Sequence, residues 1–229
     1  MLKQIRSQAS KDVSLIREGP VFFLVLNRPN NTFSTAWFRK VIEKLDEVDR
    51  STGAAVLVTL GSGGKIFSTG FDLKKASENI LSDYVTSYDL YKRLLSLSVP
   101  SLCVMSGHTY AGGLFLSICH DLKILQSDAR VSLSEINAGV PFGNGYSAIL
   151  EHMLDYATMK HMMYGESVSS KLALKRNVCD AVYQSDAELE QFIRSFAEEF
   201  APKAVDRDKI RQQKQNAYQD VFRVLETEC

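Results

Sequence analysis

Two glycine-containing segments have the residue types that enolate or acyl chemistry needs from a backbone. Residues 67–73 read FSTGFDL, and residues 107–113 read GHTYAGG at the start of an apolar, helix-like run. Glycines and small residues let main-chain N–H groups approach a ligand closely, and a helix N-terminus adds the positive end of a dipole. Brought together, the two segments would form an oxyanion hole. Glycine-rich turns also occur for purely steric reasons, so this chemistry needs an acid or a base beside it.

Glu135 is the carboxylate best placed to act with such a hole. It follows a strand-like run, residues 129–134, and precedes the sequence INAGVP of residues 136–141. A carboxylate at a strand end among apolar neighbours can have its pKa raised toward the range of a general base. The alternative from the sequence alone is a carboxylate that caps a helix or lies in a loop.

Other catalytic patterns are absent from the sequence. Residues 61–65, GSGGK, resemble a phosphate loop, but Thr59 and Ile66 stand where that motif needs Gly and Ser or Thr. There is no GxSxG elbow of a serine hydrolase and no HExxH motif. The four histidines do not cluster, and no Cys/His set has zinc-ligand spacing, so we predict no metal site. Lys65 beside a ligand phosphate remains open.

The composition excludes several classes of protein. The chain has 229 residues with 27 Lys+Arg and 27 Asp+Glu, so its formal charge is zero and it has no electrostatic footprint for nucleic acid. With 45% hydrophobic residues it can form a packed core. No apolar run approaches the roughly 20 residues that span a bilayer. Residues 1–11 are basic and free of acids, which leaves a short presequence open, and the C-terminal ETEC is not a peroxisomal signal of the SKL type.

The hydrophobic pattern predicts alternating strands and helices. A buried strand over 21–26, a helix from Ser34 to about Arg50 and a strand over 54–60 predict a parallel pair joined by a right-handed crossover. We then expect a helix over 76–98, a strand over 102–105, a helix from 111 toward His120, and strands over 122–125 and 131–133. From Tyr146 onward the pattern is helical, with amphipathic residues 186–200 and a polar final stretch, 206–225, that is either a solvated helix with one packing stripe or a subunit contact.

The order of these motifs resembles the crotonase (enoyl-CoA hydratase/isomerase) superfamily. The resemblance rests on residues 26–29 (LNRP), 67–73, 106–108 (SGH), 111–113 (AGG) and 134–141 (SEINAGVP), and spans about residues 21–183. It implies an α/β fold, the crotonase-like spiral of strand-strand-helix turns with a C-terminal helical region. It divides the chain into an acyl-CoA-binding core, 1–183, and a helical segment, 184–229, with contacts in a homotrimer or hexamer.

The resemblance also implies a substrate and its binding residues. The substrate would be an acyl-CoA thioester, with coenzyme A as part of the substrate and no separate cofactor. The oxyanion donors would be the backbone N–H groups of Thr69 and Gly112, and Tyr110 and Phe115 would line the acyl pocket. The coenzyme A end would lie near Asn30, Asn31, Thr32, Lys65, Ser68, Gly70, Phe71 and Asp72.

One departure from the family pattern indicates the reaction. Family hydratases carry one glutamate in the helix after the glycine loop and a second in the strand-end motif; here Phe115 occupies the first position and Glu135 keeps the second. Water addition needs two groups, whereas a 1,3-proton shift needs one base and an oxyanion hole. The sequence therefore favours isomerisation of 3-enoyl-CoA to 2-enoyl-CoA in fatty-acid β-oxidation, in a peroxisome or mitochondrion. A hydratase, another crotonase reaction or a non-catalytic acyl-CoA-binding homologue are the alternatives.

Overall fold

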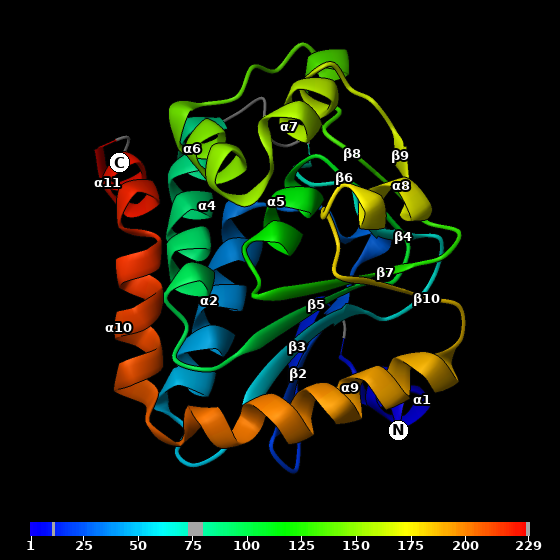
Figure 1. The fold of residues 1–229 in the computed structure, drawn as a ribbon, viewed down its shortest axis with the longest axis vertical. Coiled ribbons are helices and arrows are strands. Elements are labelled where there is room, and N and C mark those ends of the chain that lie inside the picture. Colours follow the sequence, from blue (N-terminus) through cyan, green and yellow to red (C-terminus); the bar gives the residue numbers. More distant parts are fainter. Residues whose placement is uncertain (11, 73–79, 228–229) are drawn as a thin grey trace.

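Two β-sheets form the centre of the protein in a computed structural model, which describes residues 1–10, 12–72 and 80–227 (Figure 1). The larger sheet has the order β1-β2-β3-β5-β7-β10, and the smaller one β4-β6-β8-β9. The strands of the larger sheet are β1 (Asp12–Glu18), β2 (Val21–Asn27), β3 (Val56–Gly61), β5 (Ser101–Met105), β7 (Leu122–Gln126) and β10 (Ala181–Tyr183). Those of the smaller sheet are β4 (Ile66–Ser68), β6 (His108–Tyr110), β8 (Arg130–Ser132) and β9 (Val168–Ser169).

Helices cover both faces of the larger sheet and continue to the C-terminus. The α-helices are α1 (Leu2–Gln8), α2 (Thr35–Arg50), α4 (Ile80–Leu95), α5 (Gly112–Ile118), α6 (Asn144–Met153), α7 (Tyr156–Met163), α8 (Ser170–Lys175), α9 (Asp186–Phe200), α10 (Arg207–Ala217) and α11 (Gln219–Thr227). Short 3-10 turns are η1 (Pro29–Asn31), η2 (Ile136–Ala138) and η3 (Ala201–Val205). None of the described helices is long and apolar enough to cross a membrane.

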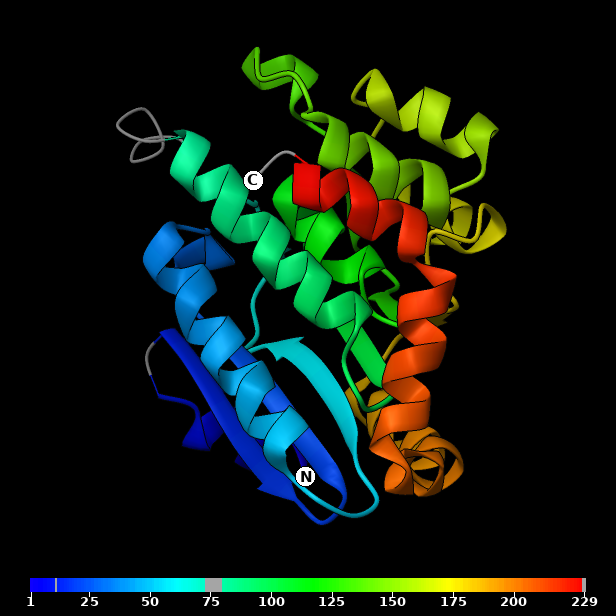
Figure 2. The ribbon, with the colours of Figure 1, turned by 90° about the vertical axis from the view of Figure 1, so that its left-hand side faces the viewer.

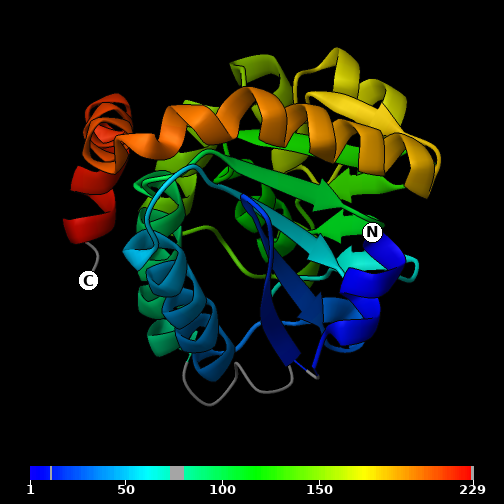
Figure 3. The ribbon, with the colours of Figure 1, turned by 90° about the horizontal axis from the view of Figure 1, so that it is seen from below.

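Strand alternation sends the apolar side chains of β2 to two separate cores. Phe22 and Leu24 belong to a cluster with residues of α2 and α4, whereas Phe23 and Val25 belong to a cluster with residues of α9. Successive strand residues point to opposite faces, so a continuous apolar run such as β2 must be covered on both sides. Figure 2 shows α2 and α4 side by side on one face, and Figure 3 shows α9 running across the other.

The chain repeats one unit in which each turn adds a strand to both sheets. β3 and β4 precede α4, β5 and β6 precede α5, and β7 and β8 precede η2 and α6. Strands β3, β5 and β7 are parallel neighbours in the larger sheet, and β4, β6 and β8 are parallel neighbours in the smaller one. The strand-strand-helix spiral expected from the sequence is confirmed, with its C-terminal helical region.

Most predicted elements are present with shifted ends. The parallel β2–α2–β3 unit is confirmed, with Ser34 as the N-cap of α2, but β3 begins at Val56. The helix expected to run toward His120 ends at Ile118, and the final stretch is two helices that meet at Tyr218. Residues 76–79 of the helix expected over 76–98 lie outside the described residues. The basic N-terminus is α1, followed by β1, an antiparallel edge strand that the sequence pattern did not predict.

His120 connects the larger sheet to α5. Its Nδ1 lies 2.9 Å from the carbonyl oxygen of Leu116, and its Nε2 lies 2.8 Å from Oγ1 of Thr59 on β3. A carbonyl only accepts, so Nδ1 carries the proton and Nε2 accepts from the Thr59 hydroxyl. Burial lowers the pKa of His120 to about 4. The ring is therefore neutral and holds α5, whose first residue is Gly112, against β3.

The neutral state of His120 predicts a pH-dependent stability. The unfolded chain takes up a proton near pH 6.5 and the folded chain only near pH 4, so this residue's contribution to the free energy of unfolding is lost as the pH falls between those values. The loss should reach about 3 kcal/mol at pH 4. NMR of the imidazole should show no titration of His120 between pH 8 and 5.5. A His120 midpoint above pH 6 would contradict the assignment.

Candidate active site

Three consecutive turns of the spiral bring the predicted site residues to one edge of the smaller sheet. Ser68 of β4 is paired with Thr109 of β6, and Tyr110 is paired with Ser132 of β8. Because the strands are parallel, the segments that leave them emerge side by side. Those segments carry Gly70, Gly112 and Glu135.

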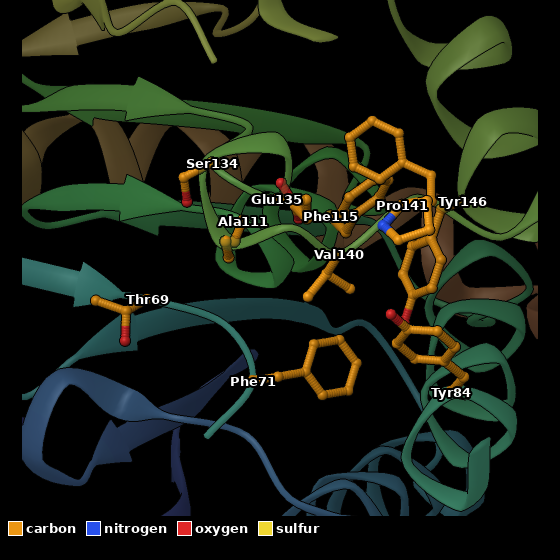
Figure 4. A pocket seen from close by; sticks show the side chains of 12 residues that line it. Thr69, Phe71, Tyr84, Ala111, Phe115, Ser134, Glu135, Val140, Pro141 and Tyr146 are labelled. Atoms are coloured by element: carbon orange, nitrogen blue, oxygen red, sulfur yellow. The ribbon is translucent and has the colours of Figure 1, made fainter. Parts of the chain in front are cut away.

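A cavity of about 80 Å³ lies at this edge. Its polar end has Thr69, Ala111, Ser134 and Glu135, and the other end is aromatic (Figure 4). The remaining lining residues are Phe71, Tyr84, Phe115, Ala138, Val140, Pro141, Phe142 and Tyr146.

Glu135 lies between the polar and the aromatic ends of the cavity. It immediately precedes η2, and Oε2 of its carboxylate is buried with no hydrogen-bond partner among the described residues. Burial raises the pKa of Glu135 from 4.5 to about 7, because the apolar surroundings penalise the charged form. A carboxylate with a pKa near neutrality is suited to accept a proton and return it. The strand-end position that singled out Glu135 in the sequence thus gives it the environment of a base.

The segments after β4 and β6 touch backbone to backbone. A Cβ on Gly70 would lie 2.5 Å from the backbone nitrogen of Gly112, and Gly70 also has a φ of +76°. A Cβ on Gly113 would lie 2.7 Å from Cβ of Ser68. Only glycine fits these positions, so both segments keep their N–H groups close to the same point of the cavity.

The structure corrects one of the two predicted oxyanion donors. The N–H of Thr69 donates to the carbonyl oxygen of Asn30 at 3.1 Å and is therefore already used. Phe33 bonds to the neighbours of Phe71, through the carbonyl of Gly70 and the N–H of Asp72. The N–H of Phe71 thus points away from Phe33. Among the described residues, neither this N–H nor that of Gly112 has a protein partner, so Phe71 replaces Thr69 as the candidate donor beside Gly112.

Two residues predicted to bind coenzyme A have their side chains occupied inside the protein. Asn31 is 3% exposed; its Oδ1 accepts from the N–H of Arg28 at 2.8 Å, and its Nδ2 donates to the carbonyl of Phe67 at 2.7 Å. The buried Ser68 hydroxyl donates to the carbonyl of Asn31 and accepts from the N–H of Gly70. These contacts fix the turn around η1 against the segment after β4. Both side chains therefore position the backbone, and contact of these two residues with coenzyme A stays a prediction.

The other predicted coenzyme A residues lie at or outside the cavity. Asn30 and Lys65 are exposed, Thr32 and Asp72 are half-buried, and none of the four lines the cavity. The backbone of Asn30 has a φ of +53° and provides the carbonyl that accepts from Thr69. Contacts of these residues with coenzyme A stay predictions.

The cavity is lined by one of the two side chains expected in the acyl pocket. Phe115, from α5, forms part of the wall, but Tyr110 does not line the cavity and its ring stacks on His108 with centroids 5.8 Å apart. Contact of Tyr110 with an acyl chain stays a prediction. Tyr84, Phe142 and Tyr146 were missed: they come from α4, the segment before α6, and α6 itself. Nothing in their sequence spacing distinguishes them from core aromatics.

Glu135 should lower the stability of the protein at neutral and alkaline pH. The folded chain keeps the carboxyl proton up to about pH 7 and the unfolded chain only up to about 4.5, so stability contributed by protonated Glu135 is lost as the pH rises between those values. The free energy of unfolding of Glu135→Gln at pH 8 should therefore be about 1–3 kcal/mol higher than that of the parent. Urea denaturation checks this, and the difference should vanish below pH 4.5. Equal stability of the two proteins at pH 8 would refute the raised pKa.

Comparisons with known proteins agree with this geometry. A family model described as "Enoyl-CoA hydratase/isomerase" matches residues 17–228. The chain is 27% identical to "Enoyl-CoA delta isomerase 3" of Arabidopsis thaliana, over 76% of this chain and 78% of that protein. It is 26% identical to "2,3-dehydroadipyl-CoA hydratase" of Escherichia coli, over 76% of this chain and 70% of that protein.

Solved structures have the same fold. An apo enoyl-CoA isomerase of Mycobacterium tuberculosis superimposes with a TM-score of 0.86 at 21% identity, covering 96% of both chains. An enoyl-CoA hydratase of Bacillus anthracis superimposes with a TM-score of 0.78 at 22% identity, covering 93% of this chain and 92% of that one. Because the family model covers nearly the whole chain and these structures share its fold, this protein belongs to the crotonase superfamily, as a member of the enoyl-CoA hydratase/isomerase family.

Proposed function

We propose that this protein isomerises 3-enoyl-CoA to 2-enoyl-CoA in fatty-acid oxidation. The Glu135 carboxylate takes a proton from C2 of the acyl chain, and the electron pair of that C–H bond moves into the thioester carbonyl to give a dienolate. Protonated Glu135 then returns the proton to C4, and the double bond forms between C2 and C3. No atom is gained or lost, so one base is sufficient.

The proposal depends most on the single carboxylate at the cavity. Among the described lining residues only Glu135 carries one, and the wall position where family hydratases have their other glutamate holds Phe115, which is 1% exposed. A hydratase needs one group to activate water and another to deliver a proton. An apolar ring at that position supplies neither, whereas it helps to exclude water from Glu135. Since both isomerases and hydratases are among the relatives, the distinction rests on this residue.

The dienolate oxygen would accept hydrogen bonds from Phe71 and Gly112. Preorganised N–H donors stabilise a charge that develops only in the transition state. The close contact of Gly70 with Gly112 supports this placement. Ala111, just before Gly112, has the unusual backbone angles φ 50° and ψ −128°, and its own N–H is held by the carbonyl of Ser132 at 2.9 Å. That anchor orients the next N–H, which belongs to Gly112.

We further propose a homotrimer or hexamer that uses residues 184–229. Helix α10 has no buried residue in this chain and offers its exposed face to another copy, whereas Val221 and Leu225 of α11 are buried against their own protomer. Light scattering of the purified protein measures the number of copies.

Glu135→Gln should reduce isomerisation by about 10²–10⁴-fold while acyl-CoA binding persists, because the amide keeps the shape and only the proton acceptor is lost. The assay follows absorbance of the conjugated thioester after mixing with a 3-enoyl-CoA. Glu151→Gln is the matched control, since Glu151 is an exposed carboxylate on α6.

The parent's kcat/KM should fall about tenfold per pH unit below pH 7, as the Glu135 carboxylate becomes protonated.

Two results would contradict the isomerase. The first is binding of 3-enoyl-CoA by the parent without conjugation, which would leave a non-catalytic binding protein or another family reaction. The second is formation of 3-hydroxyacyl-CoA from 2-enoyl-CoA by the parent, which would identify a hydratase.

Phe115→Glu should introduce measurable hydration of 2-enoyl-CoA and weaken isomerisation, because a second carboxylate would face the substrate in the position now held by the ring. Chromatographic detection of 3-hydroxyacyl-CoA measures the new activity. Phe115→Gln, of similar shape but without a charge, separates the gain of a carboxylate from the loss of the ring. If Phe115→Glu folds and binds acyl-CoA but forms no hydroxy product, Phe115 does not select the reaction.

A further inference from the structure

We propose that the cavity selects acyl-CoA thioesters with short acyl chains, because the rings of Phe71, Tyr84 and Tyr146 close its far end. This inference rests on the proposed function only in taking an acyl thioester as the ligand. It adds a substrate class and names the residue that sets the limit, Tyr84.

The three rings form a continuous wall. Ring centroids are 5.6 Å apart for Phe71 and Tyr84, 5.4 Å for Tyr84 and Tyr146, and 6.5 Å for Phe71 and Tyr146. These are contact distances for edge-to-face aromatic pairs. Each ring touches the other two, so no opening for a polymethylene chain remains between them. Figure 4 shows all three at the end of the cavity away from Thr69 and Ser134.

Two of the rings are fixed by their surroundings. Tyr146 is 3% exposed, its hydroxyl lies 2.6 Å from Oγ of Ser87, and its ring packs on Phe115 with centroids 4.7 Å apart. Phe71 packs on Phe38 with centroids 5.6 Å apart, and its backbone is bridged to Phe33. Neither can leave the wall without breaking packed core contacts.

Tyr84 is the part of the wall that can be removed without opening the core. It is half-buried on α4, and its ring contacts only the other two wall residues among the described aromatics. Its hydroxyl has no hydrogen-bond partner among the described residues. Burial, and secondarily the charge of Glu135, raises the pKa of Tyr84, which agrees with its place on the cavity surface.

The size of the cavity supports a short chain. An engineered protein cavity of about 150 Å³ accommodates benzene, which is about 25 Å³ for each carbon. A cavity of about 80 Å³, measured from its polar end to the ring wall, then accommodates about three carbons. With the thioester and its neighbouring carbon at the open end, the acyl chain has about four to six carbons.

A second hollow, of about 380 Å³, lies next to the first and shares the segment from Glu135 to Phe142. Val140 and Phe142 line both hollows. Phe142 packs on the buried ring of Phe115 with centroids 5.8 Å apart, which restricts its movement. If the length limit lies here instead, substitution of Tyr84 will have no effect on it.

Calorimetric titration with saturated acyl-CoAs tests the proposal without requiring a reaction. The parent should bind butanoyl- and hexanoyl-CoA, and should bind dodecanoyl-CoA at least tenfold more weakly than hexanoyl-CoA. Each methylene that enters an apolar site raises affinity about fourfold. Tyr84→Ala should therefore raise the affinity for dodecanoyl-CoA relative to that for hexanoyl-CoA by tenfold or more, while Tyr84→Phe, which keeps the ring, should retain the parent's ratio.

The outcomes separate this inference from the proposed function. Dodecanoyl-CoA binding as tight as hexanoyl-CoA in the parent would overturn the short-chain limit. An unchanged ratio in Tyr84→Ala would overturn Tyr84 as the residue that sets the limit, and either result leaves the isomerase standing. Discrimination by length in a protein that never conjugates a 3-enoyl-CoA would overturn the isomerase and support the ring wall. Failure to bind any of the three thioesters would overturn both.

Discussion

The backbone contact between Gly70 and Gly112 is the constraint on which the rest of the site depends. The two segments approach so closely that a methyl group on Gly70 would overlap the nitrogen of Gly112. Such an approach requires β4 and β6 to be neighbours, and these strands are neighbours only because β3 and β5 pair in the larger sheet. The pairing of successive strands in both sheets therefore sets the positions of the Phe71 and Gly112 N–H groups.

The same architecture keeps Glu135 buried. Its strand, β8, is held beside β6, and α5 is held on β3 by the neutral ring of His120. These attachments lie outside the cavity and keep Phe115 and Ala111 in place around the carboxylate. A buried carboxylate without a charged partner shifts its pKa instead of remaining ionised. Burial thus raises the pKa of Glu135 toward neutrality, and this pKa suits a base that takes up and returns a proton.

The aromatic end of the cavity links the site to the helical half of the protein. Phe71 follows β4, Tyr84 comes from α4 and Tyr146 from α6. Their rings meet because α4 and α6 pack together behind them, with α11 covering α6. Helix packing thus shapes the aromatic end of the cavity, whereas the sheets place Glu135 and the candidate N–H donors.

The sequence by itself determined most strands and helices of the core, the family, Glu135 as the candidate base and the presence of Phe115 where family hydratases have a glutamate. Those properties follow from local patterns: apolar periodicity, glycines after strands and an order of motifs that can be recognised without knowledge of tertiary contacts. It did not reveal that the Thr69 N–H is used by Asn30, that Asn31 and Ser68 bond internally, or that Tyr84 and Tyr146 line the cavity whereas Tyr110 does not. The hydrogen bonds of Asn31 with Phe67 and Ser68 join residues 36 and 37 positions apart, and the rings of Tyr84 and Tyr146 also meet from distant segments. Only the packed chain decides which N–H remains free and which ring closes the cavity.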